Sequence, residues 1–122
     1  MDHFAWPAEF FEGVRLFNEE HFFETHEVWE EVWRAAPREQ RDLYQGMIHL
    51  TVALYQARRA NWRAAHSQLR RAARRLAAFE PTAGGLEISV LRASVAHAVA
   101  RLEAGRGDIH YPKIHIPAPP AE

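Results

Sequence analysis

The sequence predicts an all-α fold, with five helices arranged as two antiparallel hairpins and a covering helix, followed by an extended, proline-rich tail. Three observations support this prediction. Apolar residues recur every three or four positions along most of the chain, which is the spacing of one helix face. Prolines fall between these segments, where helices begin and end. Alternation of apolar and polar residues, the pattern typical of a strand, occurs only briefly near Ile114 and Ile116.

The first two helices are expected over residues 8–19 and 22–35. Pro7 suits the start of the first helix, because the first N–H groups of a helix have no partner, and Glu9 favours the positive end of the helix dipole. Pro37 ends the second helix, since the residue before a proline is disfavoured in the helical region. The short connection between the two helices predicts that they pack antiparallel.

Three more helices are expected over residues 39–59, 62–79 and 86–104. Asn61 can cap the second of these, because its side chain can accept a hydrogen bond from a free backbone N–H. Gly105 follows the third at the position that commonly takes left-handed backbone. The loop before this last helix is marked by three helix-breaking residues, Pro81, Gly84 and Gly85.

Length and composition narrow the class of protein. With 122 residues, the chain is expected to form one helical domain over 1–122, with extended termini at 1–7 and 106–122. It has no cysteine, which excludes disulfides and thiolate metal sites. No apolar segment reaches the roughly 18 residues of a membrane span, and no secretion signal is present, so we expect a cytoplasmic protein without a membrane partner.

The charges are unevenly distributed, although the net charge is only −1. Residues 1–60 carry 11 acidic and 6 basic residues, whereas residues 61–122 carry 5 and 9. Such asymmetry is expected where complementary faces pack together or meet in a homo-oligomer. An arginine stripe on the fourth predicted helix is more typical of a solvated face than of a nucleic-acid site, so no nucleic-acid partner is expected. Its expected acidic partners, in the same chain or in another subunit, lie on the outer face of the second helix: Glu24, Glu27 and Glu31.

A histidine and a carboxylate are neighbours on the second predicted helix. At 100° per residue, His26 falls at the edge of the apolar face, beside Trp33, and Glu30 lies one turn further on the same side. Glu27 lies just outward of this pair. The arrangement suits proton transfer or ligand binding, because histidine exchanges a proton near neutral pH.

The third predicted helix is apolar on two sides, which indicates a central helix with partners on each side. Between those sides runs a narrow polar stripe: Asp42, Gln45, His49 and Gln56. Gly46 borders the stripe, and a glycine inside a helix costs about 1 kcal/mol relative to alanine, so close approach of another helix or a ligand is expected there. Because buried polar groups need partners, we expect the stripe to face His26 and Glu30.

These residues predict a polar, partly buried site for a small ligand or a divalent metal between the second and third helices. The candidates for catalysis are His26, Glu27 and Glu30. The candidates for ligand binding are Gln45, His49, Trp33 and Gln56. The metal ligands would be His26, Glu30 and His49, since "HEVWE" is one residue from a zinc-peptidase pattern. The alternative is an interaction module, such as a homodimer, in which the polar cluster only satisfies buried groups.

Other site types lack their patterns in this sequence. No serine lies in a nucleophile-elbow motif, and there is no glycine-rich phosphate loop. A di-iron site is excluded, because the third helix supplies no glutamate. The large apolar residues of the second to fourth helices are expected in the core: Trp29, Trp33, Met47, Leu50, Leu54 and Leu69.

Two stretches, "LFNEEHFFETHEVWEEVWR" and "YQGMIHLTVALYQARRANWRAAHSQLRRAARRL", resemble the domain-of-unknown-function 309 (DUF309) family of small, mostly prokaryotic helical proteins. The resemblance covers residues 16 to about 78 and implies an all-α bundle without an established activity. Relatives often have glycine in the first turn, where this chain has Glu20. The helix pairs are also similar to tetratricopeptide hairpins, which are usually interaction scaffolds. The family pattern is matched by Phe17, Asn18, Phe23, Glu24, His26, Glu27, Glu30, Trp33, Gln45, Gly46 and Asn61.

Overall fold

The computed structural model describes residues 5–117, and within them the prediction of an all-α fold with five helices is confirmed. Of the expected extended termini, residues 1–4 and 118–122 lie outside this range. The α-helices are α1 (Ala8–Asn18), α2 (Phe22–Ala35), α3 (Arg41–Arg58), α4 (Trp62–Leu76) and α5 (Ile88–Glu103). The smaller elements are the 3-10 turns η1 (Arg38–Gln40) and η2 (Ala77–Phe79) and the strands β1 (Thr82–Ala83) and β2 (Leu86–Glu87).

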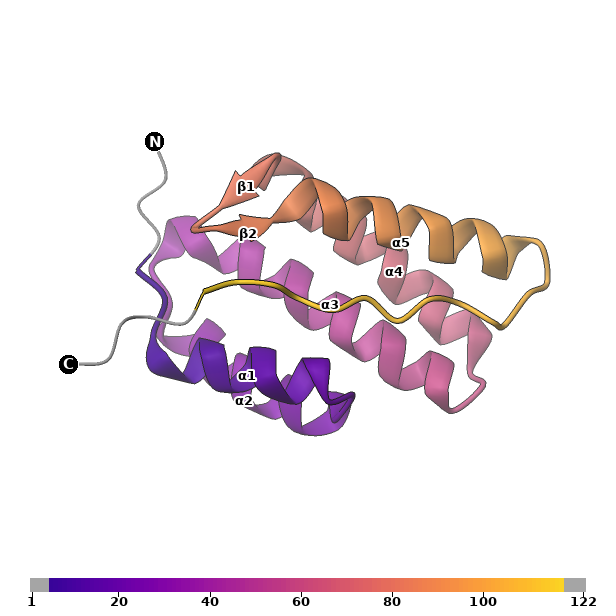
Figure 1. Cartoon of the computed structure of the whole chain (residues 1–122), viewed down its shortest axis with the longest axis horizontal. Coiled ribbons are helices and arrows are strands. Elements are labelled where there is room, and N and C mark those ends of the chain that lie inside the picture. The colour runs from indigo at the N-terminus through magenta and orange to yellow at the C-terminus, as the bar shows by residue number, and fades with distance from the viewer. Residues whose placement is uncertain (1–4, 118–122) are drawn as a thin grey trace.

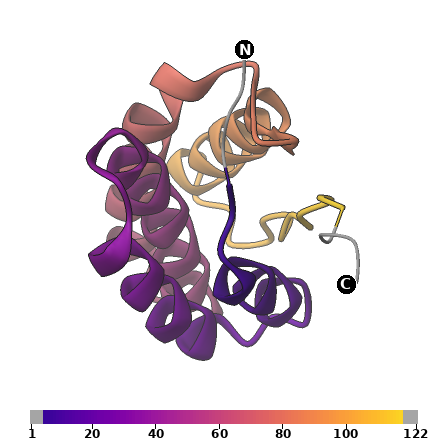
Figure 2. The ribbon, with the colours of Figure 1, turned by 90° about the vertical axis from the view of Figure 1, so that its left-hand side faces the viewer.

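Consecutive helices run antiparallel and pack side by side in chain order (Figure 1). Seen end-on in Figure 2, they follow an arc from α1 through α3 to α5, which leaves an opening between α1 and α5. The tail, residues 104–117, turns back after α5 and lies in this opening. No described helix is both long and apolar enough to cross a membrane.

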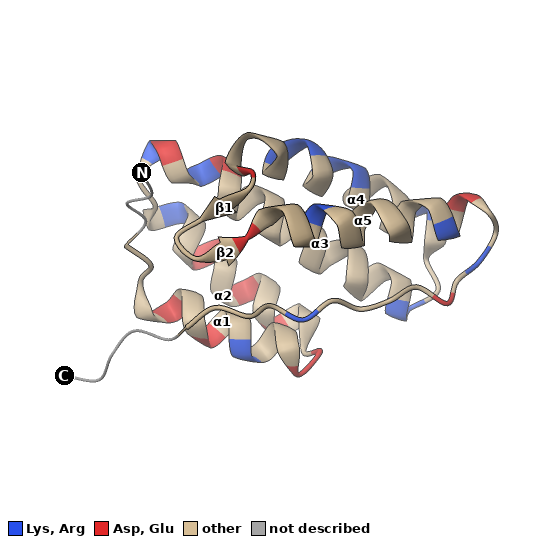
Figure 3. Cartoon of the chain, turned by 45° about the horizontal axis from the view of Figure 1, so that its top comes forward, with Lys and Arg blue, Asp and Glu red and all other residues tan. Residues whose placement is uncertain are grey.

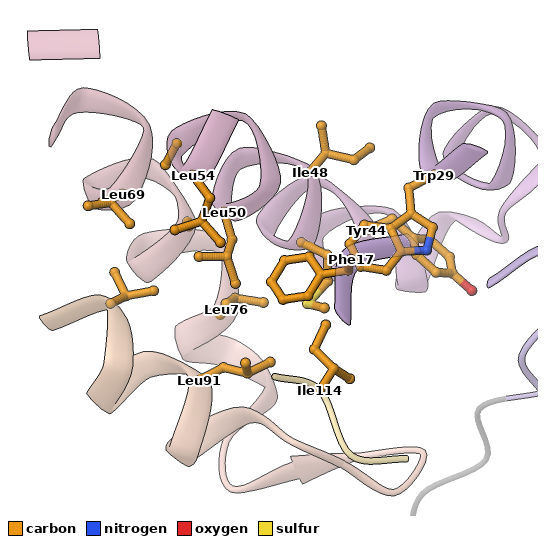
Figure 4. Packing of buried hydrophobic residues seen from close by; sticks show 14 of the residues in the cluster. Phe17, Trp29, Tyr44, Ile48, Leu50, Leu54, Leu69, Leu76, Leu91 and Ile114 are labelled. Atoms are coloured by element: carbon orange, nitrogen blue, oxygen red, sulfur yellow. The ribbon is translucent and has the colours of Figure 1, made fainter. Parts of the chain in front are cut away.

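The core fills the inside of the arc and continues into the tail. Phe17, Trp29 and Tyr44 form its aromatic end, and leucines of α3, α4 and α5 form the other (Figure 4). Ile114 of the tail is 3% exposed and packs in the same cluster. Because α3 contacts both α2 and α4, most of its apolar side chains are buried, as expected of a central helix.

Trp33 departs from the prediction that it belongs to the core. Its side chain is only partly buried, and the Arg41 guanidinium lies 4.7 Å from the centre of its ring. The other predicted core residues are buried: Trp29, Met47, Leu50, Leu54 and Leu69. Trp33 lies near the end of α2, and the residue over its ring is Arg41, the first residue of α3, so the indole lies at the edge of the core.

Asn18, the last residue of α1, holds the tail in place. Its side-chain nitrogen donates to the Ile114 carbonyl at 2.9 Å, and its side-chain oxygen accepts from the Ile114 N–H at 2.8 Å. Lys113 adds a hydrogen bond from its ammonium to the Asn18 carbonyl at 2.6 Å. An extended segment has no internal hydrogen bonds, so these contacts satisfy backbone groups that the tail cannot pair by itself.

Three helices end in the same left-handed turn, but only one uses glycine. The residues with positive φ are Glu20 (66°) after α1, Ala60 (60°) after α3 and Gly105 (76°) after α5. After α1, the Glu20 and His21 N–H groups bond the Phe17 and Leu16 carbonyls, each at 2.9 Å, which is the Schellman pattern. Glu20 therefore adopts a left-handed backbone that glycine adopts at lower cost.

Several boundaries differ from those predicted. The expected helix over 39–59 begins as the 3-10 turn η1, and the expected helix over 62–79 tightens into η2 after Leu76. The loop before α5 contains an unpredicted two-stranded hairpin, β1 with β2. Its turn residues, Gly84 and Gly85, both have positive φ, 55° and 85°, which matches the two-residue turns that join such strands.

Candidate functional site

His26 and Glu30 form an ion-pair contact on the side of α2 that faces α3. The His26 Nε2 and Glu30 Oε1 atoms are 3.3 Å apart, and each side chain is 32% exposed. The pair arises locally, because residues four apart on a helix lie one above the other. It is therefore neither sealed in the core nor fully solvated.

A hollow of about 210 Å³ opens beside His26, between α2 and the second half of α3. Its lining residues are Phe22, Phe23, His26, Val52, Tyr55 and Gln56. Phe23 forms an exposed rim at 51% exposure, and its ring centre lies 5.9 Å from that of Tyr55 and 6.4 Å from that of His26. The hollow thus has mainly apolar, aromatic walls with a titratable side chain among them.

Two polar side chains of α3 that line the hollow, Tyr55 and Gln56, are bonded by residues of the turn that follows this helix. Arg59 donates to the Tyr55 hydroxyl at 2.8 Å and lies 5.3 Å from the centre of the same ring. Asn61 donates from its side-chain nitrogen to Gln56 Oε1 at 3.1 Å. The Tyr55 oxygen already accepts a hydrogen bond, so its own O–H remains available as a donor.

His49 belongs to a different contact, which corrects the expectation that the polar stripe of α3 faces α2. Its Nδ1 atom lies 2.7 Å from Gln68 Oε1 on α4, and Asp42 pairs with Arg75 of α4 at 2.5 Å. Burial lowers the pKa of His49, and the hydrogen bond that its Nδ1–H donates to Gln68 only partly opposes this. Nearby arginines of α4 lower the pKa further, so both burial and charge disfavour the protonated form of His49.

Gly46 explains why the stripe lies against α4. An added Cβ there would lie 2.7 Å from Leu76 Cδ2 and 3.2 Å from Arg75 Cβ. The close approach predicted at this glycine therefore comes from another helix, and that helix is α4. With α4 this near, the adjoining polar side chains find their partners on α4.

The proposed three-ligand metal site is not supported by this geometry. Among the residues that the structure describes, no group of three or more His, Asp or Glu side chains is arranged to hold a metal ion. His49 bonds α4 while His26 and Glu30 contact each other, and Glu27 is exposed on the outward side of α2. Gln45 is partly buried, and Gln56 alone of the expected stripe lines the hollow with His26.

Within the described part of the chain, the ion pairs of the α4 arginines are not with the acidic face of α2. Arg75 pairs with Asp42, and Arg70 lies 3.8 Å from Glu103 of α5, whereas Glu31 of α2 pairs with Arg34 of its own helix. The acidic outer face of α2 thus points away from α4 across the width of α3. Among the described residues, three arginines of α4 form no ion pair: Arg63, Arg71 and Arg74.

Sequence reasoning missed the aromatic part of the hollow. Phe23 and Tyr55 come from different helices, and neither was predicted as a site residue. Their spacing did carry a signal, because Phe23 precedes His26 by three residues and Val52 precedes Tyr55 by three. That signal places each pair on one helix face, but it does not indicate that the two faces meet.

Two larger hollows lie elsewhere. One of about 420 Å³ adjoins Pro7, Pro37 and Tyr44, and one of about 660 Å³ lies between α4 and α5. Neither contains a histidine or a contact like that of His26 with Glu30. The hollow at His26 is smaller, but it combines a titratable pair with aromatic walls.

Comparison with models of protein families gives a match to the N-terminal part of the chain. Residues 10–68 match the sequence model of a family described as a domain of unknown function (DUF309). This segment runs from α1 into α4 and includes every residue that lines the hollow at His26. A search of curated proteins gives no match.

Proposed function

The chain belongs to the DUF309 family, and from the hollow at His26 we propose that it is a binding protein for a small, ring-sized ligand. The observation that carries this proposal is that the hollow is open at His26 instead of being filled by a closed hydrogen-bond network. A purely structural cluster would bury its polar groups with all partners supplied by the protein. Here the His26 and Glu30 side chains each keep 32% exposure at the edge of an aromatic hollow.

The size and lining of the hollow support one class of ligand. Sites for drug-sized ligands usually enclose roughly 300–1,000 Å³, so about 210 Å³ suits a single ring or a group of similar size. The rings of Phe23 and Tyr55 provide stacking surfaces, and Tyr55 and Gln56 provide hydrogen bonds at the edge. We therefore expect an aromatic or similarly sized apolar group that carries one hydrogen-bonding substituent.

His26 would provide the specific contact. Glu30 lies next to Nε2, which leaves Nδ1 to bond the ligand or exchange a proton with it. In a reaction, His26 would transfer the proton and Glu30 would orient the imidazole, while Glu27 points outward. A divalent metal is not part of this proposal, because only two of the three expected ligands approach each other.

A titration of ring-sized probes followed by NMR tests the proposal. Phenol, indole and benzoate would be added at millimolar concentration to the isotopically labelled chain. We expect at least one probe to shift the amide signals of residues around the hollow, and we expect His26→Ala and Phe23→Ala to remove those shifts. The matched control is His66→Ala, because His66 contacts Glu103 at 2.8 Å with the same 32% exposure but lies outside the hollow. Shifts that persist in Phe23→Ala, or none with any probe, would contradict a site at His26.

The interaction module is favoured as a second function by the opposite charges of α2 and α4. The helix α2 carries Glu24, Glu27, Glu30 and Glu31 against one arginine, whereas α4 carries five arginines and no acid. The two helices flank α3 (Figure 3). A two-fold axis parallel to α3 would bring α2 of one copy opposite α4 of the other, which suits a homodimer.

Sedimentation velocity at low and high salt tests the homodimer. We expect a dimer that dissociates as salt screens the charges. Glu27→Arg should weaken it, and combining Glu27→Arg with Arg71→Glu should restore it, because the second change returns the opposite charge across the interface. A monomer at every concentration and salt would exclude this function without affecting the ligand site.

A further inference from the structure

A second surface, the α4–α5 groove, lies beyond the segment that matches the family. Its volume is about 660 Å³, and it lies open between the two helices. Its floor is made of small apolar side chains: Ala73, Ala77, Val95, Ala96, Val99 and Ala100. Its rim is made of charged side chains: Arg70, Arg74, Arg92 and Glu103. All of these residues follow residue 68, where the family match ends.

The floor is shaped to admit another helix. Val95 is buried at 1% exposure, whereas Ala77, Ala96 and Ala100 remain exposed. Because alanine side chains are short, a third helix can approach α4 and α5 closely and place larger side chains between them. An exposed strip of small apolar residues along two adjacent helices also costs free energy in water, which burial by a partner would recover.

The rim is basic and only partly neutralised. Arg92 has its partners within the chain, since it pairs with Glu80 and its Nε donates to the Ala73 carbonyl at 3.1 Å. Glu103 already contacts His66 at 2.8 Å, and its distance to Arg70 is 3.8 Å. Arg74 has no ion pair within the described part of the chain, and α4 has no acidic residue to provide one (Figure 3). The free charge at this rim is therefore positive.

We infer that the α4–α5 groove binds an acidic amphipathic helix of a partner protein. Leucine-like side chains of such a helix would pack on the alanine and valine floor, and its flanking carboxylates would pair with Arg74 and Arg70. Along α5, the groove extends from Arg92 to Glu103, about 16 Å at 1.5 Å per residue, which matches about three turns of a partner helix. The groove is an open trough, whereas small-molecule sites usually enclose most of their ligand, so a helix suits it better.

A designed peptide tests this inference. The probe is a labelled peptide of about 16 residues, long enough to form a helix, with leucine at helical spacing on one face and glutamate elsewhere. Binding to the full chain is measured by fluorescence anisotropy. We expect saturable binding that weakens with added salt, and at least tenfold weaker binding of the same peptide with lysine in place of glutamate. Absence of saturable binding, or equal affinity for both peptides, would overturn the proposal.

Variants locate the binding surface. We expect Arg74→Glu and Ala96→Glu to weaken binding of the acidic peptide at least tenfold, because each places a carboxylate in the groove. The matched control is Arg63→Glu, which makes the same charge change on the same helix at another exposed, unpaired arginine outside the groove. It should change the affinity less than twofold. Circular dichroism melts verify that each variant is folded.

Two outcomes of these experiments would overturn the groove as the binding surface. One is an equal loss with Arg63→Glu and Arg74→Glu, which would indicate attraction by the overall charge of α4. The other is tighter binding to phosphatidylglycerol vesicles than to the acidic peptide, with the same dependence on Arg74, which would assign the groove to an anionic lipid surface. None of these readouts depends on the ligand site at His26.

Discussion

On the side of α3 that faces α4, His49 bonds Gln68 across a tight helix contact, whereas on the side that faces α2, His26 lies beside Glu30 at an open hollow. The difference follows from the residues around each histidine. Gly46 lets α4 approach closely on one side, whereas the rings of Phe23 and Tyr55 line the hollow on the other. The two histidines therefore have different expected roles, His49 in packing and His26 in binding.

The largest effect is expected from Gly46→Ala, which tests the close contact between α3 and α4. The new Cβ would lie 2.7 Å from Leu76 Cδ2, so we expect a loss of about 1–3 kcal/mol in the free energy of unfolding, as for other overpacked cores. Urea denaturation measures it. At an exposed glycine inside a helix, the same substitution would instead raise the free energy of unfolding by about 1 kcal/mol. A gain in stability would therefore contradict the close contact between α3 and α4.

A smaller effect is expected at the two left-handed turns that lack glycine. Ala60 has φ of 60° and a short apolar side chain, so Ala60→Gly should raise the free energy of unfolding by about 0.5–1 kcal/mol. Glu20→Gly should gain less, because the Glu20 carboxylate pairs with Arg58 and, at 3.3 Å, with Lys113. Urea denaturation of both variants provides the comparison. A larger gain at Glu20 than at Ala60 would show that those ion pairs contribute little.

A weaker effect is expected from the pH dependence of His49. Burial lowers the pKa of His49 in the folded chain, so the unfolded chain binds its proton more readily. The contribution of neutral His49 to the free energy of unfolding should be fully present above the ordinary histidine pKa of about 6.5. It should be lost as the pH decreases below that value. We expect His49→Gln to reduce the loss of stability between pH 7.5 and pH 5.5. An NMR titration in which His49 protonates at or above pH 6.5 would contradict this.

The smallest effect on stability is expected from His26→Ala, at the hollow between α2 and α3. Exposed ion pairs contribute about 0–1 kcal/mol, so removal of this one should change the free energy of unfolding by less than about 1 kcal/mol. The same change at His66 provides the reference, since the two histidines are equally exposed. A loss well above that at His66 would indicate that His26 holds the core together, and the structural alternative would then replace the ligand site.

Local chemistry was enough to predict much of the fold. Pro37 ends α2 after Ala35, Asn61 caps α4 by accepting a hydrogen bond from the Ala64 N–H at 3.5 Å, and Gly105 takes positive φ after α5. Each of these signals acts within a few residues, so neighbouring sequence contains all the necessary information. The contact of His26 with Glu30 is predictable for the same reason, because helix geometry alone brings the two residues together.

Tertiary structure alone decided which helix covers each face. The spacing of Gln45, His49 and Gln56 places them on one side of α3, but their partners depend on how closely α2 and α4 approach, and side-chain size at the contacts sets that distance. The hollow at His26 likewise exists only because Phe23 and Tyr55 meet from two helices. Periodicity determines the faces of one helix, whereas the fit between different helices determines which of those faces become a site.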